Sequence, residues 1–141
     1  MIFKRESLTV YSTGYFYTEN VTDQVNELVR ATAVRQGIVN VLLRHTTGAI
    51  VLMEHEAGVL ADIRDALERF LPPDLAMYHH DRGVDRNGHA HVLSSLFNGS
   101  LSIPVEDGET VLGEYQDIVF IDFQPERNAR EITVTIMGES V

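Results

Sequence analysis

Short segments that alternate apolar and polar residues recur along this chain, and this is the pattern of β-strands that bury one face. The alternation is clearest in Ser7–Tyr11 and Ile132–Met137. Two apolar runs, Ile38–Leu43 and Ala49–Met53, instead predict buried strands. Further extended segments are expected at Tyr15–Tyr17, Ser100–Ile103 and Asp117–Phe123.

Apolar residues at helical spacing predict two main helices. The first runs from Asn20 or Thr22 to about Gln36, and Gly37 is expected to end it. In the second helix, Gly58–Leu71, one face is apolar and the other is mostly charged.

The segment that follows the second helix has weaker signals. Pro72–Pro73 ends that helix, and glycines within Met77–Gly88 predict a loop. A short helix is then expected over His89–Phe97, where Asn98–Gly99 stops it.

Helices come early and in the middle of the chain, strands are frequent toward its end, and no regular alternation of strand and helix occurs. We therefore expect an α+β fold with a largely antiparallel sheet. The 141 residues have no linker or internal repeat and match the common size of one domain, so residues 1–141 are expected to form a single domain.

Composition narrows the classes of partner. The formal charge is −10 and the 11 lysines and arginines are scattered, so no nucleic-acid partner is expected. The N-terminus lacks the apolar region of a signal peptide, and no run is long enough to span a membrane. The absence of cysteine fits a cytoplasmic location and leaves imidazole, carboxylate and carbonyl groups as the ligands for any metal.

Histidines are the candidate chemistry of this chain. His45 follows a buried strand and precedes Thr46 and Thr47, and four histidines and two aspartates then fall between Tyr78 and His91. Imidazole and carboxylate groups suit Zn²⁺ and its neighbours. The spacing matches no established zinc motif, so incidental loop histidines remain the alternative, as does a buried His45 bonded to a backbone carbonyl.

The candidate carboxylates and cations each have a structural alternative. Glu54 ends an apolar run and is either a buried functional carboxylate or a surface residue. Asp62 lies in the first turns of a helix, where a carboxylate is stabilising on its own account. Arg127 and Arg130 suit phosphate binding or the protein surface. No nucleotide-binding loop or serine-hydrolase motif occurs.

The order of these motifs resembles the YjbQ family, whose members are often labelled secondary thiamine-phosphate synthases. The resemblance extends over roughly residues 5–139. The matching segments are His45-Thr46-Thr47-Gly48-Ala49-Ile50 with Glu54, Asp62, Tyr78 with His80, Asp85-Arg86-Asn87-Gly88-His89-Ala90-His91, Gly99–Val105, Leu112–Ile118 and Arg130. Departures from the family pattern are Met53, Gly88, Glu114-Tyr115 and Gln124–Asn128.

This resemblance implies a β-sandwich-like α+β core, a homotrimer and a polar pocket. In the enzyme hypothesis, His45, His80 and His91 hold a divalent metal (Zn²⁺ or Mg²⁺) that acts on a phosphate group. The catalytic residues would be Asp85, Glu54 and Arg130, and the substrate-binding residues would be Thr46, Thr47, Asn87, His89 and Gln116.

The labelled reaction joins a pyrimidine pyrophosphate to a thiazole phosphate with loss of pyrophosphate. A second hypothesis is a trimeric module that binds a metal ion or a small phosphorylated metabolite without turnover. In a third, the protein is structural and its histidines are incidental.

Overall fold

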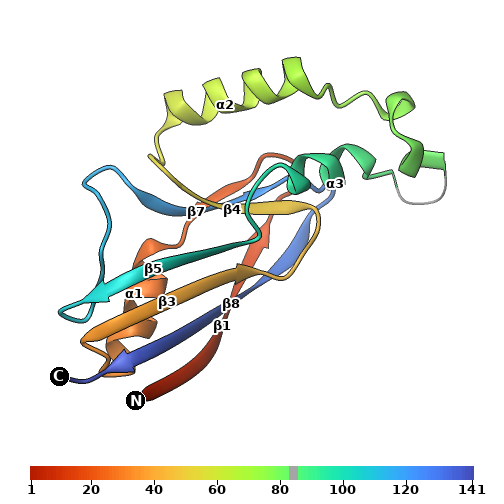
Figure 1. Cartoon of the computed structure of the whole chain (residues 1–141). Helices are drawn as coiled ribbons and strands as arrows, with labels where there is room; N and C mark the ends of the chain where they lie inside the picture. Colours follow the sequence, from red (N-terminus) through yellow and green to blue (C-terminus); the bar gives the residue numbers. More distant parts are fainter. Residues whose placement is uncertain (83–85) are drawn as a thin grey trace.

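Two antiparallel sheets form the body of the protein (Figure 1). The computed structural model describes residues 1–82 and 86–141, apart from the side chains of Leu75 and Arg82. Across the larger sheet the order is β1 (Ile2–Ser12), β8 (Asn128–Glu139), β3 (Gln36–Leu43), β5 (Ser100–Glu106) and β6 (Glu109–Thr110). Across the smaller sheet it is β2 (Thr18–Asn20), β7 (Asp117–Asp122) and β4 (Gly48–Met53).

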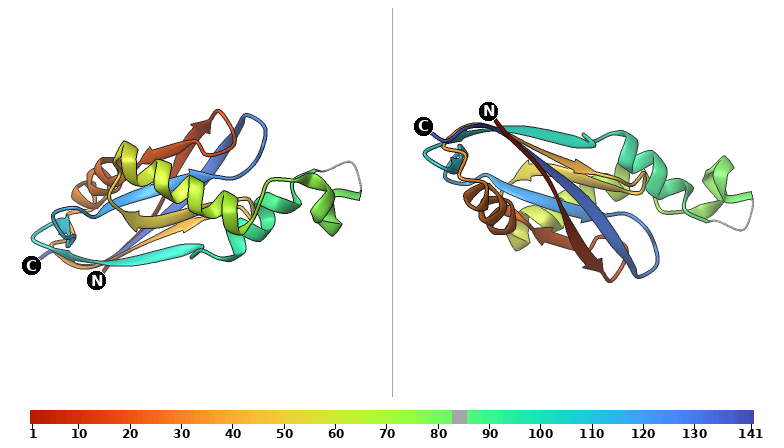
Figure 2. Two further views of the ribbon diagram at one scale, coloured as in Figure 1. Left: turned by 90° about the horizontal axis from the view of Figure 1, so that it is seen from above. Right: turned by 90° about the horizontal axis from the view of Figure 1, so that it is seen from below.

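Helices and sheets stack in layers (Figure 1), and in the view from above the helix formed by Ala57–Phe70 lies across strands of the smaller sheet (Figure 2). Helix α1 (Thr22–Ala31) shares its core with the inner face of the larger sheet and one face of β7. The other face of the smaller sheet packs against α3 (Gly88–Ser95) and the later part of α2 (Ala57–Phe70). Two short 3₁₀ turns, Leu75–Met77 and His79–Arg82, lie between these two helices. The expected α+β fold with a sandwich-like antiparallel core is confirmed.

Strand β7 shows why a continuous apolar run forms the middle of the sandwich. Ile118 and Phe120 face the larger sheet, whereas Val119 and Ile121 face the helices on the other side. Because both faces are covered, apolar residues are favoured at every position of the strand. Asp122, two residues beyond Phe120, is a fully buried carboxylate that directly follows the four apolar residues of this strand.

The first predicted helix is shorter than the sequence pattern indicates. It ends at Ala31, and the prediction that it continues to Gln36 was wrong. The Thr32 hydroxyl donates to the carbonyl oxygen of Val29, and Ala33 adopts a positive φ that turns the chain away. Gly37 does not end the helix but lies in β3, opposite Gly138.

Two further expectations about strands need correction. Ile38–Leu43 is not buried on both faces, because Ile38 and Leu42 lie on an outer surface that none of the described helices covers. Tyr15–Tyr17 is not extended: it forms a turn in which Phe16 has a positive φ, and the strand begins at Thr18.

Helix α2 begins where its sequence predicts but is less buried than its apolar face indicates. Glu56 caps its N-terminus by accepting hydrogen bonds from the amides of Gly58 and Val59. No residue of this helix is fully buried. Within the described ranges, no helix has the length and apolar character needed to cross a membrane.

Candidate functional site

A polar pocket of about 440 Å³ opens at one end of the sandwich. It lies where β3 ends, β4 begins, α3 begins, and the β7–β8 loop returns to the larger sheet. We call it the His45 pocket, and its lining residues are Arg44, His45, Thr46, Thr47, Asn87, His91, Gln124, Asn128, Ala129 and Arg130.

The lining of the His45 pocket differs in composition from the chain as a whole. Two arginines and two histidines line it, and none of its described lining residues is an aspartate or glutamate. The chain as a whole has 21 acidic residues and a formal charge of −10. The exposed Arg44 guanidinium and the hydrogen-bond donors of the other lining side chains favour anionic ligands, although the charge of Arg130 is itself balanced by the buried Asp122.

Arg130 is held beneath the pocket by a buried ion pair. Its Nη2 donates to Asp122 Oδ1 at 2.7 Å and to the Thr47 hydroxyl at 2.8 Å. Arg130 is 5% exposed and Asp122 is fully buried. Two rigid partners therefore fix the plane of the guanidinium group, as is favourable for binding an oxyanion.

Asp122 also organises the loop that follows it, and it is not among the predicted site residues. Its carboxylate accepts hydrogen bonds from the Ser12 hydroxyl, the Asn128 side-chain amide and the Gln124 backbone amide. These bonds bring β1, β7 and β8 together under the pocket. A carboxylate inside an apolar strand, eight residues before an arginine, is the sequence signal that could have revealed it.

Several buried polar atoms beside the pocket have no hydrogen-bond partner among the residues that the structure describes. They are Asn87 Oδ1, Asn128 Oδ1 and Arg130 Nε, all on residues that line the His45 pocket. Buried polar groups in folded proteins are nearly always paired, so unpaired ones mark sites that need an explanation. Here the pocket walls contain donors and acceptors that could form hydrogen bonds to a ligand after a small rearrangement of the side chains.

The His45 side chain is anchored to the neighbouring strand. The Glu131 backbone amide donates to His45 Nε2 at 2.9 Å. Burial lowers the pKa of the His45 imidazole, and the Arg130 guanidinium lowers it further. The ring is therefore neutral near pH 7. The bond is to a backbone amide, not to a carbonyl as the structural alternative supposed.

The predicted metal ligands are only partly brought together. The His80 and His91 rings meet edge to face with their centroids 4.8 Å apart, and His91 lines the His45 pocket. Among residues 1–82 and 86–141, no three histidine, aspartate or glutamate side chains are placed to hold one ion. Because His45 Nε2 is already bonded to the Glu131 amide, the three-histidine set does not fit a metal ion in this arrangement. Asp85 lies outside the described residues.

His89 has a structural position instead of a place in the pocket. Its Nε2 donates to the carbonyl oxygen of Leu71 at 2.9 Å, just beyond the end of α2. Its ring is buried between those of Tyr15 and Tyr78. His89 therefore connects α2 to α3, whereas His91 on the same helix lines the pocket.

Glu54 and Gln116 lie at the opposite end of the smaller sheet from the His45 pocket. The pocket contains Thr47, just before β4, whereas Glu54 follows the last residue of this six-residue strand. At about 3.3 Å per residue, the seven steps from Thr47 to Glu54 place these two residues about 23 Å apart. Gln116 precedes β7, whose first residue, Asp117, pairs with Met53 at the end of β4. The side-chain oxygen of Gln116 accepts a hydrogen bond from the Gly113 backbone amide. One chain does not bring these two residues to the pocket.

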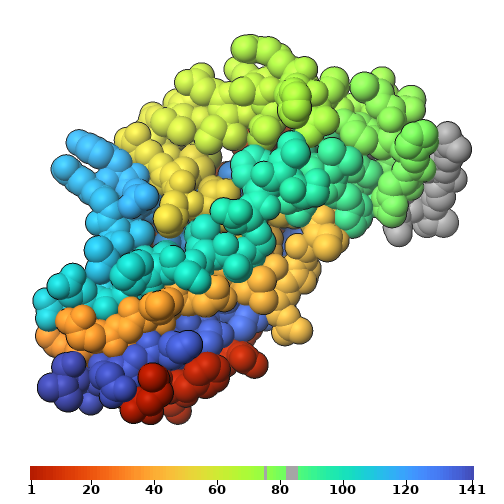
Figure 3. Space-filling model, in the orientation of Figure 1, coloured from red at the N-terminus to blue at the C-terminus, as the bar shows by residue number. Residues whose placement is uncertain are grey.

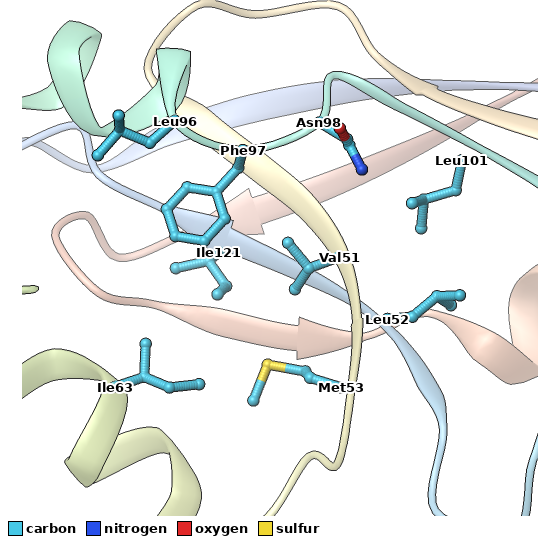
Figure 4. A pocket seen from close by; sticks show the side chains of 9 residues that line it. All are labelled: Val51, Leu52, Met53, Ile63, Leu96, Phe97, Asn98, Leu101 and Ile121. Atoms are coloured by element: carbon cyan, nitrogen blue, oxygen red, sulfur yellow. The ribbon is translucent and has the colours of Figure 1, made fainter. Parts of the chain in front are cut away.

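A second hollow, of about 480 Å³, lies between β4, α2 and the end of α3 (Figure 4). Its lining is apolar except for Asn98, and it contains no charged side chain to bind a phosphate group. The side chains that line it are those of Val51, Leu52, Met53, Ile63, Leu96, Phe97, Asn98, Leu101 and Ile121.

The fold and the pocket define a class of small α+β proteins with a histidine- and arginine-lined site at one end of a β-sandwich. The family described as UPF0047 protein YjbQ-like matches residues 6–139, and the chain belongs to this family.

Relatives and solved structures agree with this assignment. A UPF0047 protein of Archaeoglobus fulgidus is 40% identical over 113 residues, which are 80% of this chain and 86% of that protein. One from Methanothermobacter thermautotrophicus is 37% identical over 120 residues, 85% of this chain and 82% of that one. A crystal structure of a YbjQ-like protein of unknown function from Sulfolobus solfataricus superposes with a TM-score of 0.90 at 31% identity, covering 97% of this chain and 98% of that one.

Proposed function

We propose that this protein binds a small phosphorylated metabolite in the His45 pocket. The observation that carries the proposal is the lining: two arginines and two histidines, without a carboxylate among the described lining residues, in a chain of charge −10. Phosphate oxygens accept hydrogen bonds from arginine, imidazole, hydroxyl and amide groups, all of which line this pocket.

We further propose that the bound metabolite is a substrate of thiamine-phosphate-synthase-type chemistry. Such a reaction joins a pyrimidine pyrophosphate to a thiazole phosphate and releases pyrophosphate. The support for this finer proposal is the resemblance of the motif order, together with a pocket suited to phosphate groups. A binding module without turnover uses the same residues, so the two functions are separated by product formation.

Removal of one pocket cation should weaken phosphate binding without harming the fold. Arg44 lines the pocket and is solvent-exposed. Because a charge-assisted hydrogen bond contributes about 1.5–3 kcal/mol, Arg44→Gln should raise the Kd for inorganic pyrophosphate by about ten- to a hundredfold. Isothermal titration calorimetry with the full chain measures this change.

Arg69→Gln is the matched control, because Arg69 is exposed on α2 and the variant has the same net charge. Its Kd should equal that of the unmodified protein. Equal weakening by both variants would show a long-range charge effect and no defined site. An unmodified protein that gives no heat with pyrophosphate would contradict the binding proposal.

The synthase activity has its own test. The purified protein is incubated with both thiamine precursors, and thiamine phosphate is measured against a His91→Ala variant. We expect product from the unmodified protein and a marked reduction in the variant, because His91 faces the proposed phosphate site. Equal product from the two proteins would rule out this pocket as the reaction site, whereas pyrophosphate binding without product would support the binding module.

We also propose that the protein assembles as a homotrimer through the outer face of its larger sheet. Phe3, Met137, Ile38 and Pro104 are adjacent across four strands of this face. Phe3, Met137 and Ile38 are 55%, 42% and 49% exposed. Figure 3 shows these strands side by side with no helix over them. An exposed apolar row of this kind favours contact with other copies.

A charge placed in this row should dissociate the assembly. The unmodified protein should have a mass of about 47 kDa, three times the 15.8 kDa chain, whereas Ile38→Lys should give the 15.8 kDa monomer. Light scattering coupled to size-exclusion chromatography measures both masses. Tyr115→Lys, an exposed aromatic residue outside the sheet, is the control and should leave the mass unchanged. A monomeric unmodified protein would disprove the proposal.

A further inference from the structure

We infer that His45 serves this protein as a hydrogen-bond donor, through Nδ1–H, to an oxygen of the bound phosphate group, and not as a ligand of a metal ion. This inference rests on the proposed function, since it assigns one residue a role in the same pocket. It follows from the position of the ring beside β8, from the lone pair that its bonded nitrogen must present to the Glu131 amide, and from the hydrogen-bond donors that surround it.

The His45 ring occupies the position beside β8 where the next residue of a neighbouring strand would form a hydrogen bond. On the β3 side of β8, the Glu131 carbonyl accepts from the Arg44 amide, which extends the ladder one residue past the end of β3. The Glu131 amide points to the same side and donates to His45 Nε2 at 2.9 Å. The imidazole therefore completes the hydrogen bonding of β8 at the point where β3 has ended.

This bond determines which ring nitrogen carries the proton. A backbone amide can only donate, so Nε2 must present its lone pair, and in a neutral imidazole the proton then lies on Nδ1. If Nε2 were protonated, two N–H groups would face each other and the bond would be lost. The Glu131 amide thus selects the Nδ1–H tautomer, as second partners commonly do for functional histidines.

The selected tautomer has no free lone pair for a metal. Coordination through Nε2 would leave the Glu131 amide unpaired. Coordination through Nδ1 would move the proton to Nε2, against the same amide. Nδ1–H is therefore available only as a donor, and within residues 1–82 and 86–141 no acceptor for it is found.

The neighbours of His45 in the pocket are also hydrogen-bond donors that suit a phosphate oxygen. Arg130 and the exposed Arg44 line the same hollow, and Arg130 Nε has no partner in the described part of the chain. An oxyanion with several oxygens can accept from imidazole and guanidinium groups at once. A ligand without charge, such as a free sugar, would leave these donors without a strong acceptor.

Nuclear magnetic resonance tests the inference directly. A long-range ¹H–¹⁵N correlation spectrum of the ¹⁵N-labelled full chain distinguishes the two tautomers, and a His45→Asn variant assigns the signals. We expect the Nδ1–H form, a shift of the Nδ1 resonance on addition of inorganic pyrophosphate, and no change on addition of Zn²⁺. An Nε2–H tautomer, or a Zn²⁺ response that His45→Asn abolishes, would overturn the inference.

A pair of variants measures the donor itself. Asparagine and leucine have similar shapes, and neither reaches the Glu131 amide, but only asparagine can donate from the position of Nδ1. His45→Leu should therefore bind pyrophosphate about tenfold more weakly than His45→Asn. Equal affinities would contradict the donor role.

The outcomes also separate this inference from the proposed function. If pyrophosphate shifts the signals of Thr47 and Asn87 but not His45 Nδ1, the pocket binds phosphate and the donor role is wrong. If pyrophosphate shifts none of the three, the proposed function is wrong and the donor role is rejected with it, whichever tautomer the spectrum shows.

Discussion

Replacing Arg130 by methionine should lower the free energy of unfolding by about 3–5 kcal/mol, because it leaves the buried Asp122 carboxylate without its cation. Asp122 is fully buried, and its Oδ1 lies 2.7 Å from Arg130 Nη2. The remaining donors to Asp122 are neutral groups, which do not balance a full negative charge. Urea denaturation, followed by circular dichroism, measures the loss.

A double variant shows whether the ion pair is the cause. Asp122→Asn added to Arg130→Met removes the unpaired charge, so the double variant should be more stable than Arg130→Met alone. Arg69→Met, on exposed α2, should leave stability unchanged within about 0.5 kcal/mol. If the double variant is less stable than Arg130→Met, Asp122 contributes mainly through its bonds to the loop and not through its charge.

The second large effect is expected at Gly37, where two strands of the larger sheet approach each other closely. Gly37 pairs with Gly138, and a Cβ added to Gly37 would lie 2.8 Å from the Gly138 Cα and closer still to the Met137 carbonyl oxygen. These are backbone atoms of a central strand, so they cannot move aside cheaply. Gly37→Ala should therefore cost about 3 kcal/mol, as measured by thermal or urea unfolding.

Gly138→Ala should have a similar cost, because its Cβ would lie 2.7 Å from the Gly37 Cα. Gly99→Ala is the matched control: an added Cβ there would have no neighbour within 4 Å. Unfolding of Gly37→Ala at the same midpoint as Gly99→Ala would show that β3 and β8 can separate enough to accept the methyl group.

Gly37 also shows what the sequence could and could not predict about the fold. Alternation and helical spacing located most strands and the second helix, because those signals come from one face of each element. A glycine after an apolar helical stripe is typical of a helix end, so the sequence pattern predicts a helix that continues to this glycine. Its actual reason is the approach of a strand more than a hundred residues away along the chain, which local patterns do not contain.

The candidate site was predicted in the same uneven way. His45, Thr47, Asn87, His91 and Arg130 were expected to act together, and the structure gathers them in one pocket. They lie on different elements, so only the order of motifs linked them. Which end of a strand a residue occupies also depends on the fold, and this placed Glu54 and Gln116 far from the pocket.

Asp122 was not predicted as a site residue because it follows an apolar run, and such a run predicts only a buried strand. Its importance depends on a partner on β8 and another on β1. A sequence pattern that treats each element alone cannot identify such a pair. A charged residue at a position where the period predicts burial is the one local indication that it has a partner.

The central place of β8 in the larger sheet has a consequence for synthesis of the protein. Among the described strands, β1 pairs only with β8 in this sheet, and β3 pairs with β8 on one side. Because β8 lies more than a hundred residues after β1, a ribosome adding about 5–20 residues per second leaves β1 unpaired for about ten seconds. The nascent chain therefore exposes a strand with charged residues at Lys4, Arg5 and Glu6, which discourage pairing with other chains during that interval.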